Sequence, residues 1–245
     1  MSAWREALQT MRMKSVAAVW TSMLLLAGLG VLWLQIPDSH VWQLAFSILF
    51  GSGLLALFFW FCTWLFGQML HPGKRERWWV KWLLLAVVIC VWWLLQIPID
   101  RLIEHEALYA GYWTSRLPHG LRGLHTYEHL MMLQDWTYFS LRLIVTGLLL
   151  PVAVVVGAGG LGAGVRGVVH LWLRWWYWVA ALICGWLAFA ISGKLIDWTP
   201  GHGLASEMLS LLMRLGFAFT LDVLLGCFVL ALIAVGLRRV AVAAN

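Results

Sequence analysis

The chain has 245 residues, of which 62% are hydrophobic and only 11% are charged, whereas an ordinary soluble domain has about 25% charged residues. This composition excludes a soluble globular domain, a disordered chain and a small disulfide scaffold. The formal net charge is +6, which by itself would fit nucleic acid. Because the basic residues lie at the edges of apolar runs, we expect membrane lipids and no nucleic acid as their partners.

Six continuous apolar runs are long enough to cross a bilayer, whose ~30 Å hydrocarbon core needs ~20 apolar residues per helix. The runs are Ser15–Ile36, Val41–Leu70, Trp78–Ile97, Trp136–Ala158, Trp175–Leu195 and Met208–Leu237. The sequence therefore predicts an all-α integral membrane protein with six transmembrane helices in one membrane domain.

An amphipathic segment precedes the first run. Trp4, Ala7, Leu8 and Met11 recur at helical spacing among basic and polar residues. This pattern predicts a short helix that lies along the membrane interface, with these four residues on its apolar face.

The six runs are predicted to form three antiparallel hairpins, at about residues 1–72, 73–164 and 165–245. Tight turns are expected at Leu34–Pro37, Leu95–Pro98 and Leu195–Pro200, because Pro and Asp favour such turns. The second and third hairpins begin with similar Trp-rich segments, which indicates either an internal repeat or only the shared demands of turns and interfaces. Both explanations remain open.

The connection at about residues 99–135 is long and is expected to be partly helical, since Pro118 and Gly120 divide it. It contains His125-Thr126-Tyr127-Glu128-His129, which fits the pattern H-x-x-E-H and resembles the inverzincin motif over these five residues. The resemblance implies that His125 and His129 bind zinc and that Glu128 is a general base. The alternative is an interfacial helix whose polar residues face water.

Basic residues concentrate on one side of the predicted membrane. Eleven Lys and Arg residues lie in segments on this side, which are the amino terminus, the second and fourth connections and the carboxyl-terminal tail. They are Arg5, Arg12, Lys14, Lys74, Arg75, Arg77, Lys81, Arg166, Arg174, Arg238 and Arg239. By the positive-inside rule, both termini are expected on the cytoplasmic side of the cell's inner (plasma) membrane.

Three charged residues fall inside the predicted spans. Asp222 lies in the middle of the sixth run, and Arg142 and Arg214 lie nearer the ends of the fourth and sixth. A carboxylate at that depth costs ~2.5–3.5 kcal/mol on insertion scales, so it is expected to face other helices or water. Either it relays protons or ions, or it fixes helix packing through a hydrogen bond; Arg142 or Arg214 would balance its charge.

Tryptophans cluster at the side of the membrane that carries most of the basic residues. We expect six of them to be interfacial anchors: Trp78, Trp79, Trp82, Trp175, Trp176 and Trp178. Lipids are the expected bound molecules, and zinc and a tetrapyrrole are the other groups considered. No histidine lies in the middle of a span to ligate a tetrapyrrole.

The sequence contains no G-x-S-x-G, Walker A or C-x-x-C motif. The leading hypothesis is therefore a non-enzymatic scaffold or accessory subunit of a larger membrane complex, with other membrane subunits or copies of itself as partners. The alternatives are a small-solute or ion transporter that uses Asp222 for coupling, and an outer-face metal-binding protein that uses His125, Glu128 and His129.

Overall fold

The computed structural model describes residues 3–11, 13–37, 39–70, 78–116, 126–159, 162–197 and 203–243. These residues form helices and no strand. The helices are α1 (Ala3–Thr10), α2 (Met13–Leu34), α3 (Val41–Leu70), α4 (Trp78–Glu104), α5 (Glu106–Arg116), α7 (Tyr127–Ala158), α8 (Gly162–Trp172), α9 (Trp175–Asp197) and α10 (Leu204–Ala243). Six of them, α2, α3, α4, α7, α9 and α10, are long and apolar enough to cross a membrane, which confirms the predicted six-helix fold.

Several spans extend beyond the apolar runs that revealed them. Helix α7 begins at Tyr127 rather than at Trp136, and α4 continues through Pro98 to Glu104. The turn predicted at Leu95–Pro98 is therefore wrong. Hydrophobicity marks the depth of the membrane, whereas a helix continues into the interface for as long as its backbone hydrogen bonds do.

The predicted amino-terminal helix is present as α1, and Ala7 and Met11 of its predicted apolar face pack against the core. Ala3 and Ala7 are buried against α10, while Leu8 is 60% exposed. Arg239 of α10 donates hydrogen bonds to Glu6, with Nε 3.1 Å from Oε2. Helix α1 is thus attached to the last span by protein contacts, a docking that periodicity alone did not reveal.

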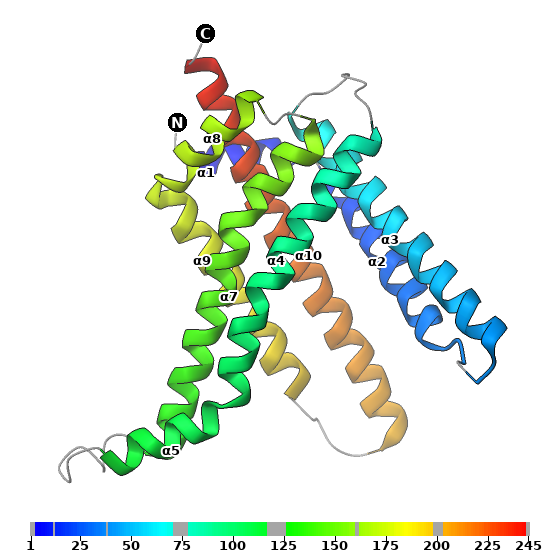
Figure 1. Cartoon of the computed structure of the whole chain (residues 1–245), viewed down its shortest axis with the longest axis vertical. Helices are drawn as coiled ribbons and strands as arrows, with labels where there is room; N and C mark the ends of the chain where they lie inside the picture. Colours follow the sequence, from blue (N-terminus) through cyan, green and yellow to red (C-terminus); the bar gives the residue numbers. More distant parts are fainter. Residues whose placement is uncertain are drawn as a thin grey trace.

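The spans pack closely at one end of the molecule and separate toward the other (Figure 1). Both termini lie at the packed end, here called the termini end, and the opposite end is called the far end. The main core lies at the termini end and joins buried residues from most helices, among them Phe66 of α3, Leu85 of α4, Val155 of α7, Leu171 of α8 and Ile233 of α10. Toward the far end, three pairs of helices diverge like legs: α2 with α3, α4 with α7, and α9 with α10.

Members of each consecutive pair contact each other, most extensively α4 with α7 and α9 with α10. Contacts between pairs are also substantial, and α3 contacts α7 more extensively than it contacts α2. The division into three hairpins therefore stays a prediction, because the first pair is held as much by its neighbours as by itself.

Basic side chains at three helix ends donate to the last carbonyl groups of neighbouring spans. Lys81 Nζ lies 3.2 Å from the carbonyl oxygen of Ala158 at the end of α7, and Arg238 donates to Met69 near the end of α3. At the far end, Nη1 of Arg214 lies 3.0 Å from the carbonyl oxygen of Leu195 in the last turn of α9. The final carbonyls of a helix have no partner within it and carry partial negative charge, so a cation is well placed there.

Glycines allow the close approach of helices at the termini end. A Cβ built at Gly157 of α7 would lie 2.5 Å from Cδ2 of Phe66, and one at Gly236 of α10 would lie 2.6 Å from Cδ1 of Leu171. Small residues have this role in membrane proteins because helix association in lipid depends on close van der Waals packing.

We predict that Gly157→Ala destabilises the protein by about 1–3 kcal/mol, since the added methyl group would overlap the buried Phe66 ring. The free energy of unfolding, measured by reversible titration with SDS, tests this. Gly53→Ala in α3 is the matched control, because a Cβ there meets nothing within 4 Å. Equal stability of the two variants would contradict the close contact between α3 and α7.

Candidate functional site

Asp222 lies midway along α10 and contacts the neighbouring span α9. The hydroxyl group of Ser192 donates to its carboxylate, with Oγ 3.3 Å from Oδ1 and 3.4 Å from Oδ2. The Asp222 side chain is nevertheless exposed on the surface of the chain. A carboxylate that is exposed within a span faces lipid, a partner or a water-filled space, and the first of these is the most costly.

Sequence reasoning missed the residues around Asp222. Trp20 of α2 donates from its indole nitrogen to Thr220 Oγ1 at 3.1 Å, and its ring meets that of Phe219 edge-on at 5.8 Å. One turn of α10 therefore contacts α2 through Thr220 and α9 through Asp222. The only sequence signal for this group was a few polar residues inside apolar runs.

Arg214, one of the two arginines expected to balance Asp222, is only 8% exposed. Besides its bond to Leu195, it donates from Nε to the carbonyl oxygen of Ser210 at 3.2 Å. Its charge is directed at the end of α9. Along α10, Arg214 and Asp222 are about 12 Å apart at 1.5 Å per residue.

Arg142 of α7, the other arginine, forms an ion pair with Asp100 of α4. Both side chains are about half exposed, at 44% and 52%. Asp100 is about 31 Å from Trp79 along α4 at 1.5 Å per residue, which is the full thickness of a bilayer core. The pair therefore lies at the far-end interface and leaves Asp222 without this counter-ion.

Only part of the predicted metal motif lies within the described residues, because His125 lies outside them. Glu128 and His129 lie in the first turn of α7, where Thr126 is the N-cap residue. Thr126 Oγ1 accepts from the backbone nitrogen of His129 at 3.4 Å and lies 3.0 Å from its Nδ1. The described part of the chain has no group of three or more potential metal ligands, so zinc binding stays a prediction.

Two carboxyl groups adjoin at the far end, where α5 packs against α7. Burial, and to a lesser degree the nearby Asp135 carboxylate, raises the pKa of Glu106. Glu106 therefore keeps its proton to a higher pH in the folded protein than in the unfolded chain. Its contribution to the free energy of unfolding is present below the usual pKa of 4.5 and is lost as the pH rises through the raised pKa.

The six predicted tryptophan anchors occupy different environments. Trp79 and Trp175 are 55% and 73% exposed, as residues that contact the interface would be. Trp176 and Trp178 pack against the core, and the indole of Trp178 donates to the carbonyl oxygen of Trp172 at 2.8 Å. Trp82 is half-buried in α4, and Trp78 begins that helix.

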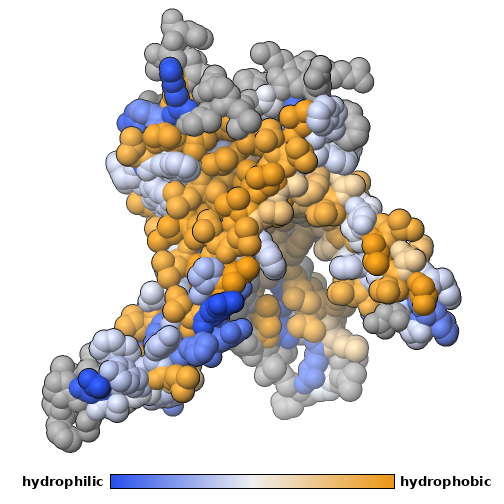
Figure 2. All heavy atoms as spheres, in the orientation of Figure 1, coloured by the Kyte–Doolittle hydropathy of each residue, from blue (hydrophilic) through white to orange (hydrophobic). Residues whose placement is uncertain are grey.

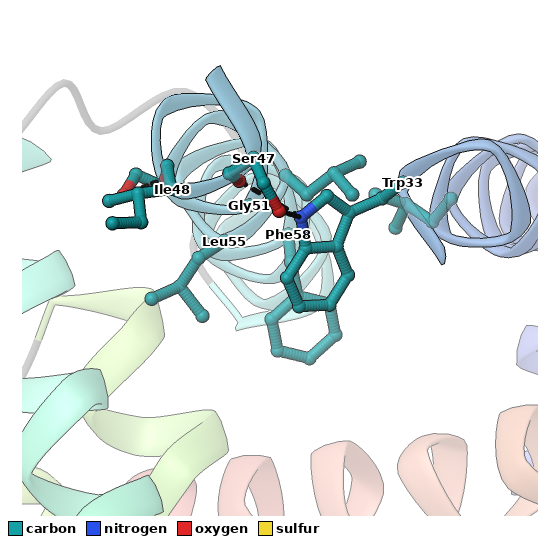
Figure 3. Close-up of a pocket in the computed structure, with 9 residues that line it drawn as sticks. Trp33, Ser47, Ile48, Gly51, Leu55 and Phe58 are labelled. Carbon is teal, nitrogen blue, oxygen red and sulfur yellow. Dashed lines mark hydrogen bonds between the residues drawn. The ribbon is translucent and has the colours of Figure 1, made fainter. Parts of the chain in front are cut away.

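An open apolar pocket of about 560 Å³ lies along α2 and α3 (Figure 3). The ring of Trp33 extends from α2 across Gly51 of α3, and its indole nitrogen donates to the carbonyl oxygen and hydroxyl of Ser47, at 2.9 and 3.0 Å. A Cβ at Gly51 would lie 3.1 Å from this ring. The pocket is lined mainly by apolar groups of two spans, so its chemistry suits hydrocarbon.

Comparison of the chain with known protein families, with characterised proteins and with solved structures found no match.

We predict that the Asp100–Arg142 pair contributes only ~0.2–1 kcal/mol, because both side chains are half exposed. A double-mutant cycle with Asp100→Asn and Arg142→Gln, read from the free energy of unfolding, measures this coupling. High salt should weaken it. A salt-insensitive loss of about 3–5 kcal/mol in a single variant would instead indicate a pair buried in the hydrocarbon.

Proposed function

We propose that this polytopic membrane protein is a non-enzymatic scaffold or accessory subunit of a larger membrane complex. The observation that carries the proposal is the separation of the spans toward the far end (Figure 1). Within its most apolar window, α2 has 6% of its residues buried inside the chain, α3 and α9 have 11% each, and only α10 reaches 39%.

Large apolar side chains cover these separated surfaces. Trp42, Leu49 and Trp60 of α3 are 66%, 71% and 56% exposed, and the space-filling view shows an apolar band across the molecule and an open space between the legs (Figure 2). Lipid could cover such surfaces, but three diverging legs also offer several apolar faces to one partner. A subunit that binds other membrane proteins and holds them in place needs exposed apolar helix faces, and it needs no catalytic group.

The distribution of charge supports a defined orientation in the cell's inner membrane. Most of the basic residues named above belong to the termini end, where Lys81 and Arg238 hold helix ends and Arg239 pairs with Glu6. We propose that this end faces the cytoplasm. Epitope tags at both termini would then be accessible in inside-out vesicles and protected in right-side-out vesicles.

Purification in a mild detergent from native membranes tests the proposed assembly. We expect a particle larger than one 27.8 kDa chain, with at least one further membrane protein, or further copies of this chain, in constant ratio by native mass spectrometry. Replacing exposed Leu49 of α3 by Asn should release the partner and leave the chain folded, whereas the same change at Leu8 of α1 is the control. A single chain alone in the detergent and in lipid nanodiscs would contradict the proposal.

A second candidate function is transport of a small solute or an ion, with Asp222 as the coupling residue. The observation that favours it is the exposed carboxylate of Asp222, bonded to Ser192 across two spans. A carboxyl group that can gain and lose a proton between helices is the usual element of a proton relay.

This candidate predicts that Asp222→Asn abolishes proton flux while the protein still folds, because the amide keeps the shape of the side chain and cannot be charged. Purified protein in liposomes, driven by a potassium-diffusion potential and read with an internal pH dye, measures the flux. Asp100→Asn is the matched control, because it makes the same chemical change at the far-end interface and leaves Asp222 intact. Wild-type liposomes no faster than empty ones, or an unchanged Asp222→Asn rate, would contradict coupling by this residue.

A further inference from the structure

A pocket of about 370 Å³ with several cationic side chains in its lining lies at the termini end, between α8 and the last turns of α10. Its lining includes His170, Arg174, Trp176, Gly236, Arg239 and Val240. We call it the arginine pocket. It differs from the groove on α2 and α3 because two guanidinium groups and an imidazole line it. A second pocket of about 290 Å³ adjoins it at His170 and is lined by Arg166.

The positions of these cations are fixed by hydrogen bonds. Nη2 of Arg174 lies 2.7 Å from Nε2 of His170, one turn back along the chain. A guanidinium group can only donate, so His170 accepts with that nitrogen. Arg239 is held from the other side by Glu6 of α1.

The charges of the two pockets leave a net positive site. Glu6 compensates Arg239, whereas the charges of Arg166 and Arg174 have no acidic residue among the lining residues of either pocket. Both arginine side chains are exposed. An anion that entered here would meet planar guanidinium groups, which bind phosphate through paired hydrogen bonds.

Exposed apolar side chains lie close to these cations, and two of them, Val169 and Leu173, line the same pocket as Arg166. Val169, Leu173 and Trp175 are 47%, 78% and 73% exposed and lie on the same stretch of chain as Arg166, His170 and Arg174. Cations directly beside exposed apolar groups match a molecule that has a charged headgroup above hydrocarbon chains. A soluble anion would not cover Leu173 or Trp175.

We propose that the arginine pocket, together with the adjoining pocket lined by Arg166, binds the phosphate headgroup of an anionic phospholipid, with its acyl chains along Val169, Leu173 and Trp175. The lipid belongs to the leaflet at the termini end. Basic pockets between transmembrane helices are known sites for anionic headgroups. The site is separate from Asp222 and from the surfaces assigned to a partner subunit, so it stands whether or not those proposals hold.

Native mass spectrometry of the whole chain in detergent, titrated with phosphatidylglycerol or with phosphatidylcholine of the same acyl chains, tests the proposal. We expect one phosphatidylglycerol to bind at least about tenfold more tightly than phosphatidylcholine. In the double variant Arg166→Gln with Arg174→Gln, its affinity should fall about 25-fold, since each arginine near an anionic lipid contributes roughly fivefold.

The matched control removes the same charge at the far end, with Arg101→Gln and Arg116→Gln, and should bind as the wild type does. Arg174→Lys keeps the charge but loses the planar fork, so it should bind with an affinity between those of the wild type and the double variant. If the double variant misfolds, the Arg174→Lys variant still tests the proposal. The free energy of unfolding confirms that each variant is folded.

Three results would overturn the proposal. The first is equal affinity for the two lipids, and the second is equal loss in the pocket and control variants. The third is release of the bound lipid by millimolar inorganic phosphate, with phosphate retained in its place, which would show that the pocket takes a soluble anion.

Discussion

The absence of water in the bilayer core is the constraint on which this structure depends. Every backbone polar group must form its hydrogen bond within the protein, so the spans are helices. The last carbonyl groups of each helix have no hydrogen-bond donor within that helix. Lys81, Arg238 and Arg214 each donate to the last carbonyls of a neighbouring span. One interaction thus satisfies a helix end, neutralises its partial negative charge and joins two spans. Basic residues at the membrane edge here have a packing role in addition to the orienting role that charge bias gives them.

Because lipid is as apolar as the helix surfaces, burial of apolar area does not drive the spans together, and close packing decides where they meet. Gly157, Gly236 and the buried ring of Phe66 provide that packing at the termini end. Toward the far end the spans diverge (Figure 1), while the rings of Phe139 in α7 and Phe189 in α9, with centroids 4.1 Å apart, still join two of the pairs. The same physics therefore produces a firm base and legs that separate toward the far end, which is the feature on which the proposed role as an assembly subunit rests.

The polar groups follow this division. At the termini end, arginines remain exposed beside apolar side chains, which suits an anionic lipid. Where the legs begin to separate, Asp222 and Thr220 connect α10 to α9 and α2. A lipid held between α8 and α10 would stabilise the base without entering the space between the legs. Partner binding and lipid binding would then occur at opposite ends of the same helices.

The sequence by itself determined the class, the six spans and the positions of the charged residues, because apolar runs of bilayer length permit no other stable state. It also located α1 approximately and indicated a partly helical connection where α5 lies, whereas it placed the start of α7 nine residues too late. Only the tertiary structure decided that Arg142 pairs with Asp100, that Arg214 binds the end of α9, and that Ala3 and Ala7 dock on α10. Such pairings join residues far apart in the chain, and they depend on how helices rotate and approach. Periodicity along one helix cannot specify that geometry when lipid and protein offer equally apolar surroundings.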